Sequence, residues 1–167
     1  WNPWDAPNVE EYYPGDEFVD WIGITALNYG TASQDKKWRS LKDIYEPFRT
    51  KILKYNKPVM FSEFGSTYYG GNQSKWLQEA LTYVKDYYHE VQSITLFYSD
   101  KDKNWATKWR PDAKTKFIDW TFKEPQKEAE MVSNFFNLKE FTNSSLNKIP
   151  TLQSNKVLKT NALSSHN

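Results

Sequence analysis

Lys57-Pro58-Val59-Met60-Phe61-Ser62-Glu63-Phe64-Gly65-Ser66 is the stretch of the chain that decides the fold. Residues 57–64 form an apolar run that opens at Lys57-Pro58 and closes at Gly65-Ser66, a pattern typical of a short buried strand. Glu63 is the one acidic residue inside this run, at the predicted strand end. Because burying a lone carboxylate is very costly, we expect Glu63 either to line a cleft or to pair with a neighbouring Lys, Arg or backbone amide.

Two similar apolar runs flank this stretch, and helical patterns separate the three. Residues 19–28 and 91–98 read as buried strands, and residues 40–55 and 74–88 carry apolar side chains at helical spacing. A capping box is predicted at Ser40-Leu41-Lys42-Asp43, and Pro47 predicts a kink or two short helices. Ser74 is the predicted cap of the second helix.

This alternation of strands and helices predicts an α/β fold with parallel strands and covering helices. It does not by itself separate a closed (β/α)8 barrel from an open doubly wound sheet. No Gly-rich phosphate loop follows any of the predicted strands, which weakens the nucleotide-binding version of the open sheet.

Polar residues gather where the predicted strands end: Asn28 and Tyr29, then Glu63, then Tyr98, Ser99 and Asp100. In a barrel, this is the face that carries the active site. A glycosidase needs two carboxylates there, one ionised to attack the sugar and one protonated to release the leaving oxygen. Tyr29 ends the strand before Glu63, so its hydroxyl could donate a hydrogen bond that orients the carboxylate. The alternative is a rim tyrosine with a buried ring and a solvated hydroxyl.

Aromatic residues are abundant, with 8 Trp, 11 Tyr and 10 Phe making up 17% of the chain. Composition alone favours a core of large side chains, but flat rings in loops also suit carbohydrate binding. One of Phe97 and Tyr98 should face the predicted site. The predicted substrate-binding residues are Tyr98, Trp105, Trp38 and Tyr68, the last beside Tyr69.

Charge and residue usage exclude several classes of protein. The formal net charge is +1, from 22 basic and 21 acidic residues, which argues against a nucleic-acid partner. No apolar run approaches the ~18 residues of a membrane span. Cysteine is absent and no paired His/Glu spacing indicates a metal site, so we predict neither metal nor cofactor.

The two ends of the chain differ from the centre. Trp1-Asn2-Pro3-Trp4-Asp5 has neither an initiating Met nor a signal peptide pattern, so we expect a piece of a longer protein whose compartment cannot be read directly. Residues 125–139 predict a helix that begins at Pro125. From Thr142 onward the chain is rich in Ser, Asn, Lys and Thr, and we expect a flexible tail.

Several of these motifs resemble glycoside hydrolase family 26, the family of β-mannanases and related β-glucanases. Residues 12–23 (Tyr-Tyr-Pro-Gly-Asp-Glu-Phe-Val-Asp-Trp-Ile-Gly) resemble the approach to its strand six, and residues 57–66 resemble its strand seven, which holds the nucleophile. Trp1-Asn2-Pro3 is similar to the end of strand five. Trp76 and Asn104-Trp105 also fit the pattern, which covers residues 1–122.

The resemblance implies the C-terminal part of a (β/α)8 TIM barrel, from the end of strand five to strand eight, at residues 1–122. Residues 123–167 would form a helical and then irregular extension. It also implies a retaining hydrolase of β-linked polysaccharide, in which Glu63 is the nucleophile and Tyr29 orients it. The acid/base residue would precede Trp1, so the N-terminal half of the barrel would be required and the 167 residues alone would be inactive. An extracellular or cell-envelope location is usual for the family.

One departure leaves the substrate open. The family usually places a tryptophan platform on strand eight, whereas this chain has Leu96-Phe97-Tyr98. A β-mannanase is one expectation, and a β-glucanase another. The alternatives are a barrel that binds polysaccharide without cleaving it, or an open α/β domain in which Glu63, Tyr29 and Tyr98 do not converge on one face.

Overall fold

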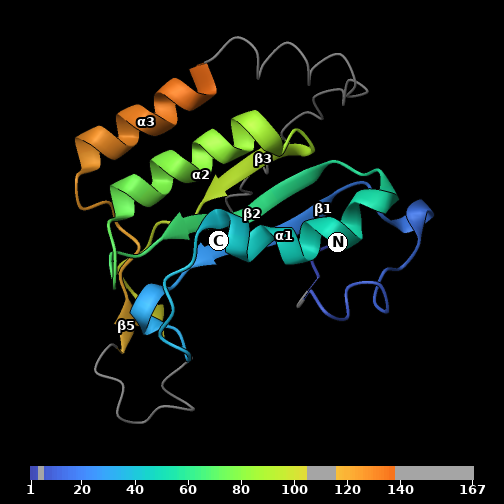
Figure 1. Cartoon of the computed structure of the whole chain (residues 1–167), viewed down its shortest axis with the longest axis horizontal. Helices are drawn as coiled ribbons and strands as arrows, with labels where there is room; N and C mark the ends of the chain where they lie inside the picture. Colours follow the sequence, from blue (N-terminus) through green and yellow to red (C-terminus); the bar gives the residue numbers. More distant parts are fainter. Residues whose placement is uncertain (4–5, 105–115, 138–167) are drawn as a thin grey trace, which may run out of the picture.

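A computed structural model of the chain describes residues 1–3, 6–104 and 116–137. Its centre is a parallel three-stranded sheet in the order β1 (Ile22–Asn28), β2 (Val59–Ser66) and β3 (Val91–Leu96). Helix α1 (Leu41–Ile52) connects the first two strands, and α2 (Gln73–Tyr87) connects the last two (Figure 1). The predicted strand–helix alternation and the predicted parallel pairing are both confirmed.

The remaining elements are short or follow the sheet. The antiparallel pair β4 (Asp102–Lys103) and β5 (Phe117–Ile118) comes after β3, and α3 (Pro125–Asn137) comes last. Single 3-10 turns occupy η1 (Asp16–Phe18), η2 (Gly30–Ala32) and η3 (Leu53–Tyr55). The predicted helix start at Pro125 is confirmed, and the predicted tail from Thr142 lies outside the described residues. Within the described ranges, every helix is too short or too polar to cross a bilayer.

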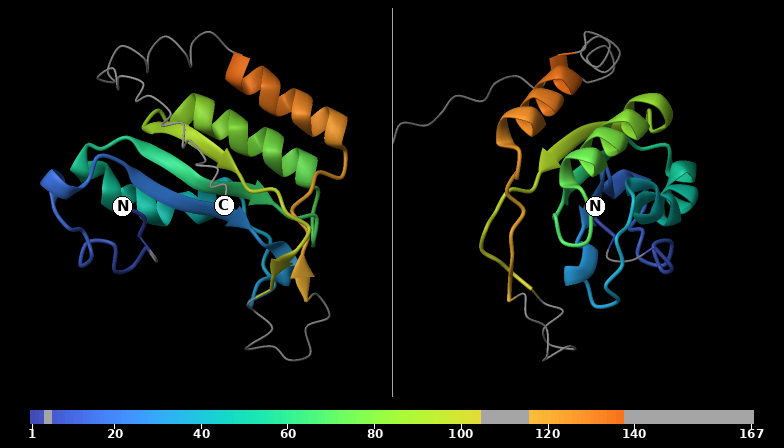
Figure 2. Two further views of the ribbon diagram at one scale, coloured as in Figure 1. Left: turned by 180° about the vertical axis from the view of Figure 1, so that it is seen from behind. Right: turned by 60° about the vertical axis from the view of Figure 1, so that its left-hand side comes forward.

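Helices α1 and α2 cover the same face of the sheet. Helix α1 lies in front of β1 and β2 in Figure 1 and behind them in the left view of Figure 2. The Tyr45 ring of α1 meets Phe61 edge-on at 5.0 Å, and the Trp76 ring of α2 lies 5.3 Å from Phe64. Both phenylalanines of β2 therefore point toward the helices, and one core cluster joins the three strands to α1 and α2.

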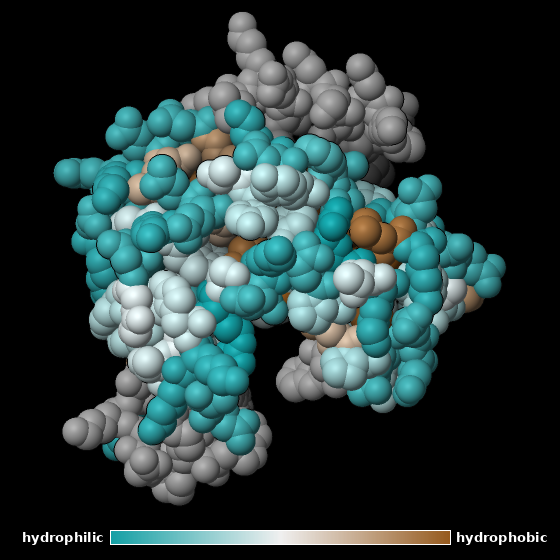
Figure 3. All heavy atoms as spheres, in the orientation of Figure 1, coloured by the Kyte–Doolittle hydropathy of each residue, from teal (hydrophilic) through white to brown (hydrophobic). Residues whose placement is uncertain are grey.

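Helix α3 packs against α2 and contributes to the same layer of helices over the sheet. Phe135 is 6% exposed and belongs to the main core cluster. The fully buried Glu128 accepts a 2.8 Å hydrogen bond from the Ser74 hydroxyl of α2 and a 2.9 Å bond from the backbone amide of Glu124. Figure 3 shows that the outer side of these helices is mostly hydrophilic, with small scattered apolar patches.

Local signals set the helix ends, with two differences from prediction. The capping box at Ser40 and Asp43 is present, but α1 continues through Pro47 as one helix, so two short helices are excluded. Burial of Leu41, Tyr45 and Ile52 on one side of α1 explains why the missing amide at Pro47 does not divide the helix. The cap of α2 is Asn72, which accepts from Lys75 N at 2.8 Å, because Ser74 is turned to Glu128 instead.

The start of the chain lies along the free edge of β1. The amino group of Trp1 donates to Trp21 O at 2.9 Å, and Gly23 N donates to Trp1 O at 2.7 Å. One residue bonded to two residues that flank its partner is the pattern of a parallel ladder. Trp1 therefore extends the parallel arrangement beyond β1.

Strand β2 contains a bulge next to Glu63. Phe61 pairs with Ile24 of β1, but the next residue of β1, Thr25, pairs with Glu63, so Ser62 is the extra residue. The register with β3 shifts over the same interval, between Phe61 and Phe64. Bulges re-aim side chains and are over-represented beside active sites. Here the bulge keeps Phe61 and Phe64 on the helix side while Ser62 and Glu63 lie between them.

Candidate active site

The candidate site lies on the face of the sheet that the described helices leave uncovered. Ile24 and Ala26 of β1 point into the core under the helices, so the residues between and after them, Thr25 and Leu27, point the other way. Glu63 lies on this same face, where the Thr25 hydroxyl donates a 2.9 Å hydrogen bond to Glu63 Oε2. In the described part of the chain this bond is the one that holds the Glu63 carboxylate, and it joins two neighbouring strands.

The sequence predicted Glu63 at the end of a strand, but Glu63 lies inside β2. The strand runs to Ser66 because its last residues still pair with β1, Asn28 with Ser66. The carboxylate nevertheless escapes the core, because the bulge breaks the alternation that would have pointed it toward the helices. Glu63 is half-buried and borders the open face.

Asn2 forms the end of the site nearest the start of the strands. Its side-chain amide lies 3.0 Å from the Ser62 hydroxyl. Asn2 also covers Gly23, where an added Cβ would lie 3.5 Å from the Asn2 Cβ. The two consecutive bulge residues therefore each have a polar partner on the open face: Asn2 for Ser62 and Thr25 for Glu63.

Trp120 forms the opposite end of the site. It is 1% exposed and clusters with Leu27, Ala32 and Ile118. The indole lies over Gly65, where an added Cβ would be in ordinary van der Waals contact with Trp120 Cε3 at 3.8 Å. Gly65 follows Glu63 by two residues on the same face, so the indole lies one step beyond the carboxylate along the strand.

Tyr29 and Asp102 meet at this tryptophan. The Tyr29 ring packs edge-on against Trp120 at 4.9 Å, and Trp120 Nε1 donates to Asp102 Oδ2 at 2.9 Å. The pKa of Tyr29 is raised to about 12, chiefly by burial and then by the charges of Asp102 and Glu63. The hydroxyl of Tyr29 therefore lies in the field of both carboxylates and remains protonated, as a hydrogen-bond donor, near neutral pH.

The loops after β1 and β2 are locked together by a buried amide. Asn28, 1% exposed, accepts from Gly30 N at 3.2 Å and from Arg39 N at 3.0 Å, and it donates to Ser66 Oγ at 3.0 Å. Gly30 has φ +55°, and a Cβ there would lie 1.9 Å from Tyr69 O. This network holds the segment that carries Tyr29.

The predicted site residues separate into two groups. Glu63 and Tyr29 lie on the same side of the sheet, although the hydrogen bond to Glu63 comes from Thr25 and not from Tyr29. Tyr98, 58% exposed, turns to the helix side, where it meets Phe122 edge-on at 5.4 Å. Of the two residues, Phe97 is the one that faces the site, with its ring 5.6 Å from that of Trp120.

The loop aromatics have mixed environments. Trp38 packs between the two loops: a Cβ added at Gly71 would lie 2.5 Å from its ring, and one added at Gly30 would lie 3.1 Å from it. Tyr68 is 39% exposed, and the Lys123 ammonium lies 4.3 Å from its ring centroid. Trp105 lies outside the described residues.

Three residues of the site were not found by sequence reasoning: Thr25, Asp102 and Trp120. Thr25 sits in a buried-looking apolar run, and only the strand register reveals that it faces Glu63. Trp120 and Asp102 are 18 residues apart and meet through the β4–β5 pair, where Asp102 is opposite Ile118. The polar stretch at residues 100–104 could have indicated Asp102 as a candidate, but nothing in that stretch indicates its partner Trp120.

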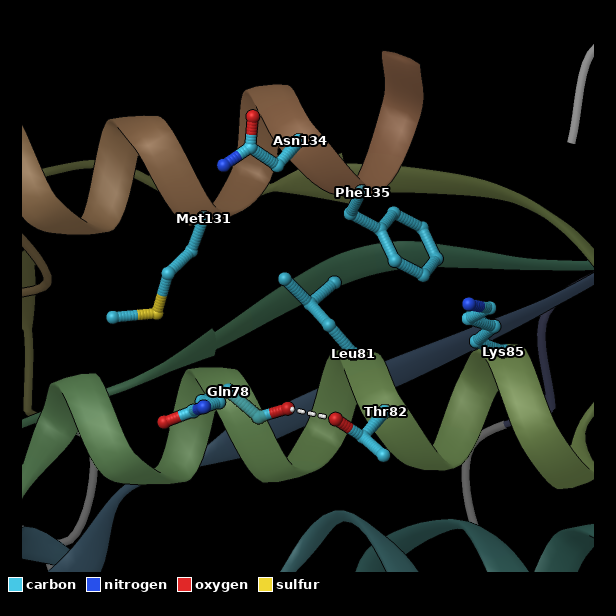
Figure 4. A pocket seen from close by; sticks show the side chains of 7 residues that line it. All are labelled: Gln78, Leu81, Thr82, Lys85, Met131, Asn134 and Phe135. Carbon is cyan, nitrogen blue, oxygen red and sulfur yellow. Dashed lines mark hydrogen bonds between the residues drawn. The ribbon is translucent and has the colours of Figure 1, made fainter. Parts of the chain in front are cut away.

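Other surface features lie away from this face. A groove of about 300 Å³ between α2 and α3 is lined by Leu81, Met131 and Phe135 among others (Figure 4). The hydrogen bond that Figure 4 draws among these residues runs from the Thr82 hydroxyl to Gln78 O at 2.8 Å and lies within α2. Across the described ranges, no group of three acidic, histidine or cysteine side chains could hold a metal ion.

A known enzyme matches part of this chain. Endoglucanase H of Acetivibrio thermocellus is 31% identical over 103 residues, which is 61% of this chain and 11% of that protein. The chain therefore spans about a tenth of the length of this relative. No family model matches the chain. The similarity supports homology to a glycoside hydrolase, which agrees with the predicted class at that level.

Proposed function

We propose that this chain forms the nucleophile side of the active site of a retaining glycoside hydrolase that cleaves β-linked polysaccharide. The observation that carries the proposal is the Glu63 carboxylate, which a bulge turns out of the core and a 2.9 Å bond from Thr25 holds on the open face. Similarity to a protein named as an endoglucanase supports a glucan as substrate. The family 26 motifs leave β-mannan as the second candidate.

The proposed scaffold is part of a (β/α)8 barrel. Strands in chain order with both connecting helices on one face favour a singly wound sheet over a doubly wound one, which has helices on both faces. Trp1 adds a further parallel neighbour at the edge of β1. In a barrel, the helix-free face is the interior, and the ends of the strands near Tyr29 and Phe97 form the mouth.

In the proposed reaction, Glu63 attacks the anomeric carbon and a protonated carboxyl group on another strand donates to the leaving oxygen. Retention requires the two carboxyl groups to be about 5–5.5 Å apart. The resemblance to family 26 places the second group before Trp1. Thr25 donates to Glu63 Oε2 and so holds the carboxylate in one orientation on the open face. Tyr29 is the proposed second donor near this carboxylate.

The test is Glu63→Gln in the full-length protein that carries this chain. We expect turnover of mixed-linkage β-glucan, or of β-mannan, to fall by several orders of magnitude, because the amide is not a nucleophile. Binding of the polysaccharide should persist. Turnover is measured by reducing-sugar release, and binding is measured by affinity electrophoresis.

Glu79→Gln is the matched control, because Glu79 is an exposed glutamate of α2 whose ion pair with Lys75 is also exposed. It should leave turnover unchanged. Unaltered turnover in Glu63→Gln would exclude Glu63 as nucleophile. Binding without turnover in the wild-type protein would instead favour the non-catalytic polysaccharide-binding barrel.

A further inference from the structure

Asp102 is a carboxylate that the fold holds firmly by one oxygen. Its Oδ2 accepts the 2.9 Å hydrogen bond from the indole of Trp120, and Trp120 is itself fixed by burial against Gly65 and Tyr29. The backbone of Asp102 is paired with Ile118, which is 1% exposed. Side chain and backbone are thus both fixed, which is the condition for a preorganised binding group.

The other oxygen of Asp102 has no protein partner in the described part of the chain. No hydrogen bond is made to Oδ1, and no described Lys, Arg or His forms an ion pair with this carboxylate. Asp102 is half-buried, so this oxygen is only partly solvated. A partly desolvated carboxylate without a cation is best satisfied by hydrogen-bond donors.

The position of Asp102 relates it to Glu63. Both carboxylates act on the hydroxyl of Tyr29, whose ring is held edge-on to Trp120, and Trp120 covers the residue two positions after Glu63. Asp102 and the Tyr29 ring also contact the same indole, at 2.9 Å from Trp120 Nε1 and 4.9 Å between ring centroids, so one tryptophan holds an oxygen acceptor and a phenol donor. A sugar hydroxyl is both a donor and an acceptor, so it can bond to both at once.

We propose that Asp102 and Tyr29 together bind one hydroxyl group of the sugar that Glu63 attacks or of the sugar next to it. The hydroxyl donates to Asp102 Oδ1 and accepts from the Tyr29 phenol, while Trp120 fixes Asp102 from behind. This inference rests on the proposed function and adds a substrate-specificity pair to it. The expected ligand class is a neutral oligosaccharide, because an anionic sugar would be repelled by both carboxylates.

The experiment uses the full-length protein with Glu63→Gln, so that binding is measured without turnover. Mixed-linkage β-glucan and β-mannan tetrasaccharides are titrated by calorimetry. In this background, Asp102→Asn should weaken binding of the tetrasaccharide that the parent variant binds by about tenfold or more, since a site built to bond a hydroxyl loses strongly when one partner is wrong. The thermal midpoint should hold, because the new amide oxygen can still accept from Trp120.

Asp86→Asn is the matched control: Asp86 is an exposed aspartate of α2, away from the open face, and the change should leave the affinity unchanged. Tyr29→Phe should weaken binding as well, and adding it to Asp102→Asn should cost less than the sum of the two single losses, since both contact one hydroxyl. Affinity within twofold of the parent in Asp102→Asn would overturn this inference and leave the proposed function standing. Failure of Glu63→Gln to bind either sugar, together with no hydrolysis by the wild type, would overturn both.

Discussion

At the scale of single residues, the sequence indicated Glu63 as a site residue but not its contact with Thr25. The apolar run around Glu63 left two alternatives, a carboxylate that lines a cleft or one that pairs with a neighbouring Lys, Arg or backbone amide. Thr25 could not be predicted as the hydrogen-bond donor to Glu63, because the predicted strand ends do not fix which residue of β1 lies opposite Glu63. The extra residue at Ser62 sets the register, and it leaves no recognisable mark in the sequence.

A prediction at this scale concerns the Thr25 hydroxyl. In the full-length protein, Thr25→Val should lower kcat for the polysaccharide by about tenfold or more with little change in KM, because the methyl cannot hold Glu63 in its attacking position. Thr25→Ser keeps the hydroxyl and should restore most of the rate. Steady-state kinetics of the two variants provide the measurement. Equal losses in Val and Ser variants would show that packing, and not the hydrogen bond, is what matters at this position.

At the scale of the elements, helix α1 was the most predictable part of the fold. Its capping box is a local pattern, and both of its hydrogen bonds form: Asp43 N donates to Ser40 Oγ at 3.1 Å and Ser40 N donates to Asp43 Oδ2 at 3.0 Å. The cap of α2 was misplaced because Ser74 and Asn72 are both good caps. The choice between them depends on Glu128, which is 54 residues away from Ser74 in the chain.

The capping box of α1 gives a prediction on stability and its pH dependence. Ser40→Ala should lower the free energy of unfolding by about 1 kcal/mol at pH 7, measured by urea denaturation. The bonds from Ser40 hold the pKa of Asp43 below its usual value, so their contribution is present above the unfolded-state pKa and is lost as the pH falls through the folded-state pKa. The gap between wild type and Ser40→Ala should therefore shrink in acid.

Gln78→Ala is the control for this measurement, because Gln78 is an exposed, uncharged residue of α2 and is not among the groups that act on Asp43. A gap between wild type and Ser40→Ala that stayed constant from pH 7 down to pH 2 would argue against a role for Asp43 in the cap.

At the scale of the whole molecule, the parallel order of the strands and the α/β class could be predicted from the alternation of patterns. The one-sided placement of the helices could not, because it depends on which face of each strand the connecting helix reaches. Glu63 and Tyr29 lie on the same side of the sheet without the predicted hydrogen bond between them, and strand parity turns Phe97 to the Glu63 side and Tyr98 to the helix side. Tyr98 and Phe97 are adjacent, so a one-residue difference in the strand end exchanges them.

The open face and the outer edge of β3 lead to a prediction for the 167 residues studied as an isolated chain. In the described ranges, β3 has a strand partner only on its β2 side, and an unpaired strand edge is a template for association. We expect the isolated chain to self-associate and to show no hydrolysis of β-glucan or β-mannan. Sedimentation velocity over a range of concentrations and a reducing-sugar assay are the measurements. A stable monomer with robust turnover would contradict the proposed barrel.

The bulge in β2 also has a consequence for how this sequence can change over time. Ser62 and Glu63 are consecutive residues on the open face, so the loss of either one keeps Phe61 and Phe64 inward, and only the loss of Ser62 also keeps the carboxylate. A deletion or insertion before Ser62 or after Glu63 in this strand would turn the side chains that follow it to the other face. Among descendants of a common ancestor that keep the carboxylate, length variation in this strand should therefore collect at Ser62, and an alignment that places the gap directly after Glu63 would pair a core phenylalanine with the carboxylate.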